Sequence, residues 1–286
     1  MNTTYTPGED PEQTLPADPL GALRDYWNEC AEHFNSGPGK TTPQLLDALL
    51  GDFPGDAPIG DALLDLACGA GLTTASLARR GAPGGRVVGV DLSTAMIDAA
   101  RSGCSQPDVD FVVASADALP FADHSFDHVF CNMGLMLFPS AADALLEIGR
   151  VLRPGGTLRA SVWGRPEHST VMSLLPSVAE SIGIALPTPP RSNFHLGQPE
   201  DLQSLLSATE LSLRSYRYQT LRFVYADGTS ACEGLGISEA RPGPAMRMVL
   251  PQDRGRLVSA CRDEADRRLQ AGGGALVLDA LLAVIA

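Results

Sequence analysis

The sequence predicts an α/β fold in which a doubly wound, largely parallel sheet carries helices on both faces. Five segments between residues 62 and 163 are nearly continuous in Val, Leu, Ile and Ala, and helical patterns alternate with them. Strands of this composition are buried on both faces, which is typical of parallel sheets. Such sheets bind ligands at the carboxyl ends of their strands, near the point where the strand order reverses. We therefore expect the functional residues at those ends.

The elements of this core follow one another in a regular order. A first helix begins near Thr42, which suits an N-cap, with Pro43 in its first turn. Ser93 is expected to cap a later helix. The expected strands cover residues 62–68, 86–91, 110–115, 126–132 and 157–163, and the expected helices that follow the first cover 73–80, 94–103 and 141–152.

The last third of the sequence is organised differently. Two excursions, 164–197 and 226–272, separate a few periodic segments from one another. Helices are expected around 169–183, from Pro199 onward and over 256–270, with one long strand or a hairpin over 210–225 and a closing strand over 280–286.

Composition and charge narrow the class of protein. The 286 residues carry a formal net charge of −13 without a dense Lys/Arg run, so neither nucleic acid nor an anionic membrane surface is expected as a partner. We expect no secretory signal at the N-terminus, disorder over about its first twenty residues, and no segment that inserts in a membrane. The six cysteines have neither zinc nor disulfide spacing, which predicts no metal and a reducing cytoplasm.

One stretch, LLDLACGAGLTT, raises the question of the ligand. Gly69 and Gly71 let a ligand approach the backbone, and the next strand ends on Asp91, which can accept from both hydroxyls of a ribose. These features fit a dinucleotide and S-adenosylmethionine (SAM) alike. Two details favour SAM. Thr74 stands where the dinucleotide fingerprint has its third glycine, and Asp65 lies inside a strand, where a carboxylate needs a polar or cationic partner.

Four separated motifs agree with one family. LDLACGAG, VVGVDLSTAMIDAAR, ASADALPFADHSFDHVFC and EIGRVLRPGGTL, in this order and spacing, resemble a class I SAM-dependent methyltransferase of the ubiquinone/menaquinone-biosynthesis-like (type 11) group. The resemblance covers roughly residues 40–165. It implies a Rossmann-like sheet of seven strands, the last of them antiparallel, with an inserted cap. It also implies SAM as cofactor and S-adenosylhomocysteine as product.

The resemblance further implies how the chain is divided and where the cofactor binds. Residues 1–40 would form a flexible tail and lid helix, 41–165 the SAM-binding core, and 166–286 the substrate cap insertions with the last helix and closing strands of the core. The implied cofactor positions are Asp65, Ala67, Gly69 and Gly71 on the methionine side, Asp91 at the ribose, Leu92 and Met96 on the adenine, Asp117 and Ala118 at the adenine amino group, Asn132 and Gly134 near the sulfonium, and Tyr26, with Trp27, as a lid.

Some of these residues also have a purely structural interpretation. Asp65 could satisfy amides of the glycine loop, and Asp117 could form the turn of SADALP. Tyr26 could be an aromatic of an ordinary helix core. The sequence leaves these alternatives open.

Methyl transfer from a sulfonium is an in-line displacement, so much of the catalysis can come from holding the acceptor in line in a desolvated pocket. An alcohol acceptor needs a general base. His168 is the catalytic candidate because it follows the end of the fifth strand, and Glu167, His195 and Glu233 are further candidates. Aromatic, Met and Leu side chains in the last third favour a hydrophobic or aromatic small molecule as acceptor.

The sequence thus predicts a cytoplasmic SAM-dependent methyltransferase of specialised or quinone-type metabolism. We expect O-methylation ahead of C- or N-methylation, and a homodimer is compatible with the sequence. Two alternatives stay open. One is a protein of the same fold that binds SAM without transferring a methyl group, as a cyclase or ligand-binding protein. The other is an NAD(P)-dependent oxidoreductase, which Thr74 and the lack of a Tyr-x-x-x-Lys pair disfavour.

Overall fold

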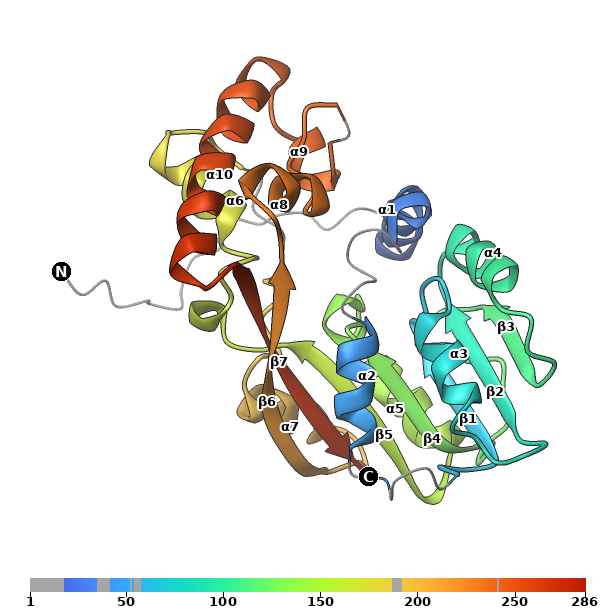
Figure 1. The fold of residues 1–286 in the computed structure, drawn as a ribbon. Helices are drawn as coiled ribbons and strands as arrows, with labels where there is room; N and C mark the ends of the chain where they lie inside the picture. The colour runs from blue at the N-terminus through green and yellow to red at the C-terminus, as the bar shows by residue number, and fades with distance from the viewer. Residues whose placement is uncertain (1–17, 35–41, 52, 54–57, 187–191, 241) are drawn as a thin grey trace.

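The fold is a twisted sheet with helices on both faces and a separate group of helices at one end (Figure 1). The computed structural model describes residues 18–34, 42–51, 53, 58–186, 192–240 and 242–286. Most of the expected N-terminal tail lies outside these residues. Among the described helices, none combines the length and the apolar character needed to cross a membrane.

Seven strands form a single sheet in the order β3-β2-β1-β4-β5-β7-β6. Neighbours from β3 to β5 pair in parallel, and β7 is antiparallel to both β5 and β6. The strand order reverses beside β1, which places the switch point between β1 and β4. This confirms the predicted fold class, including the antiparallel last strand. The strands are β1 (Ala62–Leu66), β2 (Arg86–Asp91), β3 (Val109–Val113), β4 (Phe126–Asn132), β5 (Leu152–Trp163), β6 (Leu213–Val224) and β7 (Ala275–Ile285).

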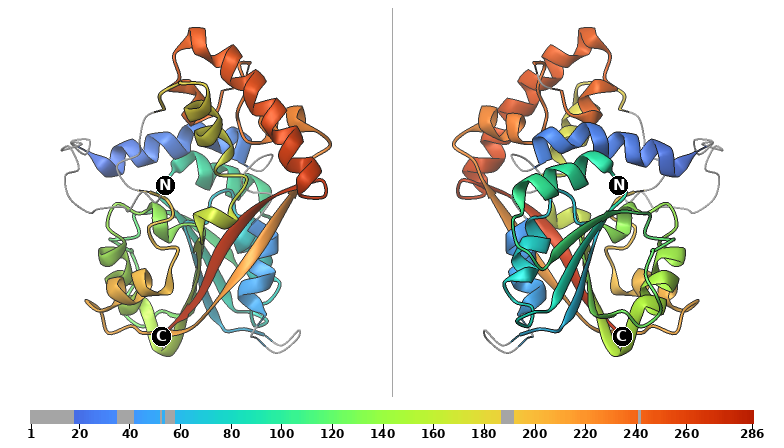
Figure 2. Two further views of the ribbon diagram at one scale, coloured as in Figure 1. Left: turned by 90° about the vertical axis from the view of Figure 1, so that its left-hand side faces the viewer. Right: turned by 90° about the vertical axis from the view of Figure 1, so that its right-hand side faces the viewer.

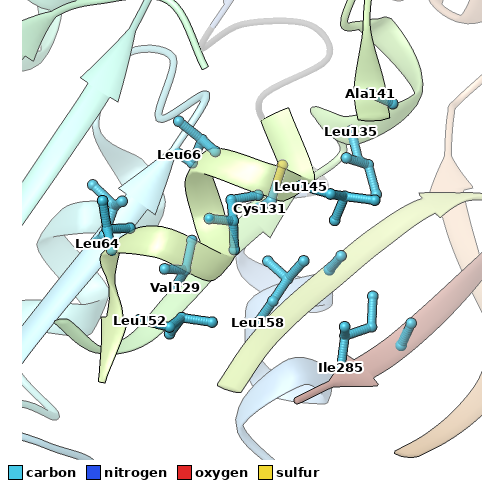
Figure 3. Close-up of a cluster of buried hydrophobic side chains, with 14 of the residues drawn as sticks. Leu64, Leu66, Val129, Cys131, Leu135, Ala141, Leu145, Leu152, Leu158 and Ile285 are labelled. Atoms are coloured by element: carbon cyan, nitrogen blue, oxygen red, sulfur yellow. The ribbon is translucent and has the colours of Figure 1, made fainter. Parts of the chain in front are cut away.

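Alternate residues of the strands face two different layers. In β1, Leu63 packs in a cluster with α2 (Thr42–Leu50) and α3 (Leu72–Ala78). Its neighbours Leu64 and Leu66 point to the opposite face, where α5 (Ala141–Val151) and α7 (Pro199–Leu206) cover a larger cluster (Figure 3). The sheet is therefore buried on both faces, as the continuous apolar strands predict.

The helix α4 (Thr94–Gly103) begins directly after β2 because a serine caps it. The Oγ of Ser93 accepts a hydrogen bond from the N–H of Met96, so one of the otherwise unpaired amides of the first turn is satisfied. The N-cap forms two residues after the end of β2. This fixes the helix N-terminus beside the carboxyl end of the strand.

The helices at one end of the molecule form what we call the cap: α6 (Leu174–Ser181), α8 (Gly228–Gly234), α9 (Pro244–Arg247) and α10 (Pro251–Ala271). They share one buried cluster with the outer halves of β6 and β7. There β7 pairs with β6 from Ala275 onward but reaches β5 only at Ala280. A two-stranded ribbon therefore leaves the sheet and holds the cap (Figures 1 and 2).

The helix α1 (Pro19–Phe34) lies between the cap and the core (Figures 1 and 2). On the core side, Oδ1 of Asn28 accepts from the Ser93 hydroxyl at 2.7 Å and from the N–H of Ala95 at 3.2 Å. On the cap side, Glu29 forms an ion pair with Arg247 of α9. One helix thus contacts both the start of α4 and the cap.

Two strands are longer than the sequence predicts, and each extension has a structural reason. β5 begins at Leu152 rather than at residue 157, because the strand includes the Pro154-Gly155-Gly156 segment. Its pairing with β4 shifts in register there. β7 begins at Ala275 rather than 280, because its first residues pair with β6 alone. The segment 210–225 forms one strand, β6, and not a hairpin.

Candidate cofactor site

Asp65 is the penultimate residue of β1 and is almost completely buried, with 1% of its surface exposed. Its Oδ2 accepts a hydrogen bond of 2.6 Å from the hydroxyl of Thr74 on α3. Its Oδ1 is buried, and no described group forms a hydrogen bond with it. Burial raises the pKa of Asp65 to about 7, and the negative charge of Asp91 adds to the effect. Thr74, which stands where the dinucleotide fingerprint has its third glycine, is thus the polar partner of Asp65.

The loop after β1 has an unusual backbone conformation. Ala67, Gly69 and Gly71 all have positive φ angles, of 58°, 53° and 81°. A Cβ on Gly69 would come within 3.0 Å of the ring of Phe34, and a Cβ on Gly71 within 3.0 Å of the methyl group of Ala100. The two glycines are therefore required by conformation and by space. Ala67 adopts the same conformation at a cost, which is typical of functional loops.

Asp91 ends β2 and ties the glycine loop to the start of α4. Its Oδ2 accepts from the N–H of Gly69 and its Oδ1 from the N–H of Ser93, both at 2.9 Å. Burial raises its pKa, although these backbone amides favour the ionised form. Each carboxylate oxygen has a second lone pair, so both can still accept from a ligand hydroxyl.

The floor of the site is formed at the ends of β4 and β5. The hydroxyl of the buried Ser161 donates to Oδ1 of Asn132 at 2.7 Å and accepts from the N–H of Met133 at 3.0 Å. Nδ2 of Asn132 donates to the hydroxyl of Thr73 at 3.3 Å. Met133 is held at a φ of 61°, which is rare for a non-glycine residue. Sequence reasoning did not find Ser161, since no local pattern marks it.

Gly134 brings this floor into contact with the loop after β1. A Cβ built on it would lie 2.6 Å from the Cβ of Ala67 and 2.9 Å from the Sγ of Cys131. The chain after β4 therefore approaches the loop more closely than any larger residue allows. Asp65, Asp91 and Asn132 with their neighbouring loops converge at the carboxyl ends of β1, β2 and β4, as the fold class predicts.

The positions expected at the adenine lie beside β2 and β3. Leu92 is half-buried, whereas Met96 is an interior residue with 1% of its surface exposed. Asp117 is half-buried in the turn after β3. The N–H of Ala118 donates to the carbonyl of Ser115 at 3.2 Å, so this amide already has a partner. Their expected role at an adenine stays a prediction.

The expected lid aromatic, Tyr26, lies on α1 with 43% of its surface exposed and its ring edge-on to Trp27. Phe34, at the end of the same helix, lies against the glycine loop, since its ring is 3.0 Å from where a Cβ on Gly69 would be. Trp27 packs edge-on against Phe34 with ring centroids 6.2 Å apart. Phe34 and Asn28 are additional site residues, and only the structure identifies them.

The candidate bases lie beyond the end of β5. His168 and Glu167 are exposed on the 3₁₀ turn η3 (Pro166–His168), and Nδ1 of His195 lies 2.8 Å from the carbonyl of Ser192. Among the described residues, no three His, Cys, Asp or Glu side chains gather as metal ligands would. The groups that converge on the loop are therefore carboxylates, an amide and hydroxyls. The buried Asp65 and the half-buried Asp91 favour a ligand with hydroxyls and positive charge over one with phosphates.

The segment that builds this site matches a known family. A family model described as a methyltransferase domain matches residues 64–160. The ubiquinone/menaquinone biosynthesis C-methyltransferase of Hahella chejuensis is 37% identical over 116 residues, which are 39% of this chain and 47% of that protein. The chain spans only part of its curated relatives. It covers 34% of a 37.1 kDa transposon protein of Streptomyces fradiae, 55% of the demethylmenaquinone methyltransferase of Lactobacillus johnsonii and 47% of the Hahella protein.

Solved structures share the fold at low sequence identity. A putative methyltransferase from Bacillus halodurans is 19% identical, with a TM-score of 0.55 over 84% of this chain and 97% of that one. The [4+2]-cyclase SpnF is 20% identical, with a TM-score of 0.52 over 84% and 80% of the two chains. The architecture is therefore the Rossmann-like class I methyltransferase fold. Because a cyclase has it too, the fold alone does not fix the reaction.

Proposed function

From the match of residues 64–160 to the methyltransferase-domain family, we propose that the chain is a SAM-dependent methyltransferase acting on a small molecule. The observation that carries the proposal is a pair of carboxylates beside the glycine loop, the buried Asp65 and the half-buried Asp91. A pyrophosphate beside them would add negative charge to a buried acidic pair. The ribose hydroxyls and the ammonium of SAM offer donors instead.

The residues present fit this cofactor. Oδ1 of Asp65 has no described hydrogen-bond partner, and both oxygens of Asp91 can accept further hydrogen bonds. When bound, SAM supplies an activated methyl group on a sulfonium. The contribution of the chain is to hold the two reacting atoms in line and to exclude water. Asn132 and Met133, fixed by Ser161, form the floor on which this alignment would depend.

We propose that the cap binds the acceptor and that the acceptor is hydrophobic or aromatic. Met133 and Trp163 pack against both the buried cluster of the core and that of the cap, so they lie where core and cap meet. The ring of Phe194 lies 5.2 Å from that of Trp163. An aromatic acceptor suits such a lining. Specialised or quinone-type metabolism is the proposed setting.

For the acceptor atom we propose oxygen ahead of carbon or nitrogen, on a phenol acidic enough to need only a modest base. His168 is the proposed base, since it follows the end of β5 and is exposed to solvent. His168→Gln should then lower kcat without changing cofactor affinity. A C-methylated product, as the name of the Hahella relative suggests for that protein, would replace this part of the proposal.

Titration calorimetry with SAM, S-adenosylhomocysteine, NAD and NADP tests the proposal. We expect micromolar binding of the two adenosyl ligands, lost in Asp91→Ala and retained in Asp110→Ala, a control that removes an exposed acid from the neighbouring strand. Binding of NAD or NADP instead would refute it. Incubation of phenolic acceptors with SAM, followed by mass spectrometry, then decides the reaction. Bound SAM that is never consumed would indicate the cyclase or ligand-binding alternative.

A further inference from the structure

Asp65 is a carboxyl group that the described part of the chain buries without a counter-charge. Its surface is 1% exposed, its Oδ2 accepts from the Thr74 hydroxyl at 2.6 Å, and its Oδ1 has no described partner. The donors that favour its ionised form, the hydroxyl and the backbone N–H of Thr74, are both neutral. They stabilise a buried anion poorly, because the carboxylate loses its hydration on every side. The protonated form has no such requirement.

The ionisable groups that face Asp65 destabilise its anion further. Asp91, at the end of β2, contributes a second negative charge. Cys68 in the loop after β1 and Cys131 on β4 are buried thiols with raised pKa values, so both are neutral near pH 7. On α3 the facing group is the uncharged Thr74. None of these groups is a cation, and the pKa of Asp65 is raised to about 7.

We infer that at pH 6 Asp65 is neutral in the free protein and ionises when the cofactor binds, releasing its proton to the solvent as a ligand ammonium takes its place. This inference rests on the proposed function. The carboxyl O–H bond breaks and the proton passes to a buffer base. A hydrogen bond from the ligand N–H to the carboxylate forms in exchange. The buried pair of acids then faces one compensating positive charge.

The inference makes cofactor affinity depend on pH in a defined direction. Below the pKa of free Asp65, each unit of lower pH must weaken binding about tenfold, because the proton competes with the ammonium. Above it the affinity must level off. A ligand that carries the adenosine but no ammonium should not show this dependence, since Asp91 and the glycine loop keep their hydrogen bonds.

Calorimetric titration of the full chain with S-adenosylhomocysteine, at pH 6 in two buffers of different ionisation enthalpy, measures the protons released. With a pKa of about 7 in the free protein, we expect about 0.9 protons per ligand at pH 6 and about 0.1 at pH 8. The neutral nucleoside 5′-methylthioadenosine, which lacks the amino-acid part, should bind with no release at either pH. Asp65→Asn should abolish the release, and Asp110→Asn should retain it.

Each other outcome overturns the inference in a distinct way. Binding of S-adenosylhomocysteine with equal enthalpy in both buffers at pH 6 refutes it and leaves the proposed function standing. Release that persists in Asp65→Asn assigns the proton to another group, such as Asp91, and refutes the role of Asp65. Failure of the wild-type chain to bind S-adenosylhomocysteine at any pH refutes both the inference and the proposed function.

Discussion

The contact between Gly134 and Ala67 offers a quantitative test of how the loops of the site fit together. Gly134→Ala would place its new methyl carbon 2.6 Å from the Cβ of Ala67 and 2.9 Å from the Sγ of Cys131. Ordinary contacts between such atoms are close to 4 Å, so the two loops must separate. Overpacking of this kind typically costs about 1–3 kcal/mol of unfolding free energy. Gly134 has a φ of −102°, which any residue adopts, so the cost is one of space alone.

Ala67→Gly removes the methyl group on the other side of this contact. It also relieves a φ of 58°, worth about 1–2 kcal/mol for a non-glycine residue, and adds the backbone entropy of glycine, about 0.5–1 kcal/mol. The two terms nearly cancel, so the single variant should stay within about 1 kcal/mol of the wild type. In the Ala67→Gly background, Gly134→Ala should then cost at least about 1 kcal/mol less than it does alone, although the contact with Cys131 remains.

Urea unfolding of the wild type, both single variants and the double variant gives this coupling energy directly. Titration with S-adenosylhomocysteine on the same four proteins shows whether the loops also set cofactor affinity. Additive free energies, with no coupling beyond about 0.3 kcal/mol, would mean that the two loops do not meet as described. The geometric reasoning for the floor of the site would then be wrong.

Three further perturbations test other contacts. Arg165→Met should lower the urea midpoint of unfolding more than Asp279→Asn does. Only the first variant leaves the buried carboxylate of Asp279, with 1% of its surface exposed, without its cation. Equal effects of the two variants would contradict the pairing. The unfolding free energy of Asp65→Asn should rise relative to that of the wild type by up to roughly 4 kcal/mol between about pH 4 and pH 7. In this range Asp65 ionises in the unfolded wild type but stays protonated in the folded one, because burial raises its native pKa. Asn28→Ala should lower the unfolding free energy by about 1 kcal/mol and speed amide hydrogen exchange in α1, because the hydrogen bond with Ser93 is lost. Unchanged exchange rates would show that this bond does not hold α1 on the core.

Much of the core follows from the sequence because its signals are local. Buried parallel strands need apolar residues on both faces, and this need is visible in any window of five or six residues. The strand β2, the helix α4 and the strand β4 have the predicted bounds. Gly69 and Asp91 could be found for the same reason, since each stands at the end of a strand that its own neighbours define.

The partners within the site could not be predicted because they come from distant segments. Ser161 meets Asn132 only when β5 pairs with β4, and Asn28 meets Ser93 across 65 residues. A serine in a strand or an asparagine in a helix carries no sign of such a contact. Phe34 is a similar case, since its helix must first lie on the glycine loop. The start of β7 follows Gly272, Gly273 and Gly274, a turn signal that could have indicated the longer strand.

The ribbon that carries the cap has a consequence for how proteins of this design can diversify. Val224 and Ala275 are paired across the two strands, so the fifty residues between them start and finish at neighbouring points. A longer, shorter or unrelated insertion at that point closes on the same pair and leaves the register of β5, β7 and β6 unchanged. The part of the cap formed by α8, α9 and α10 can therefore be exchanged as one unit. The carboxyl ends of β1, β2 and β4, at the other end of the sheet order, keep their geometry when this part changes.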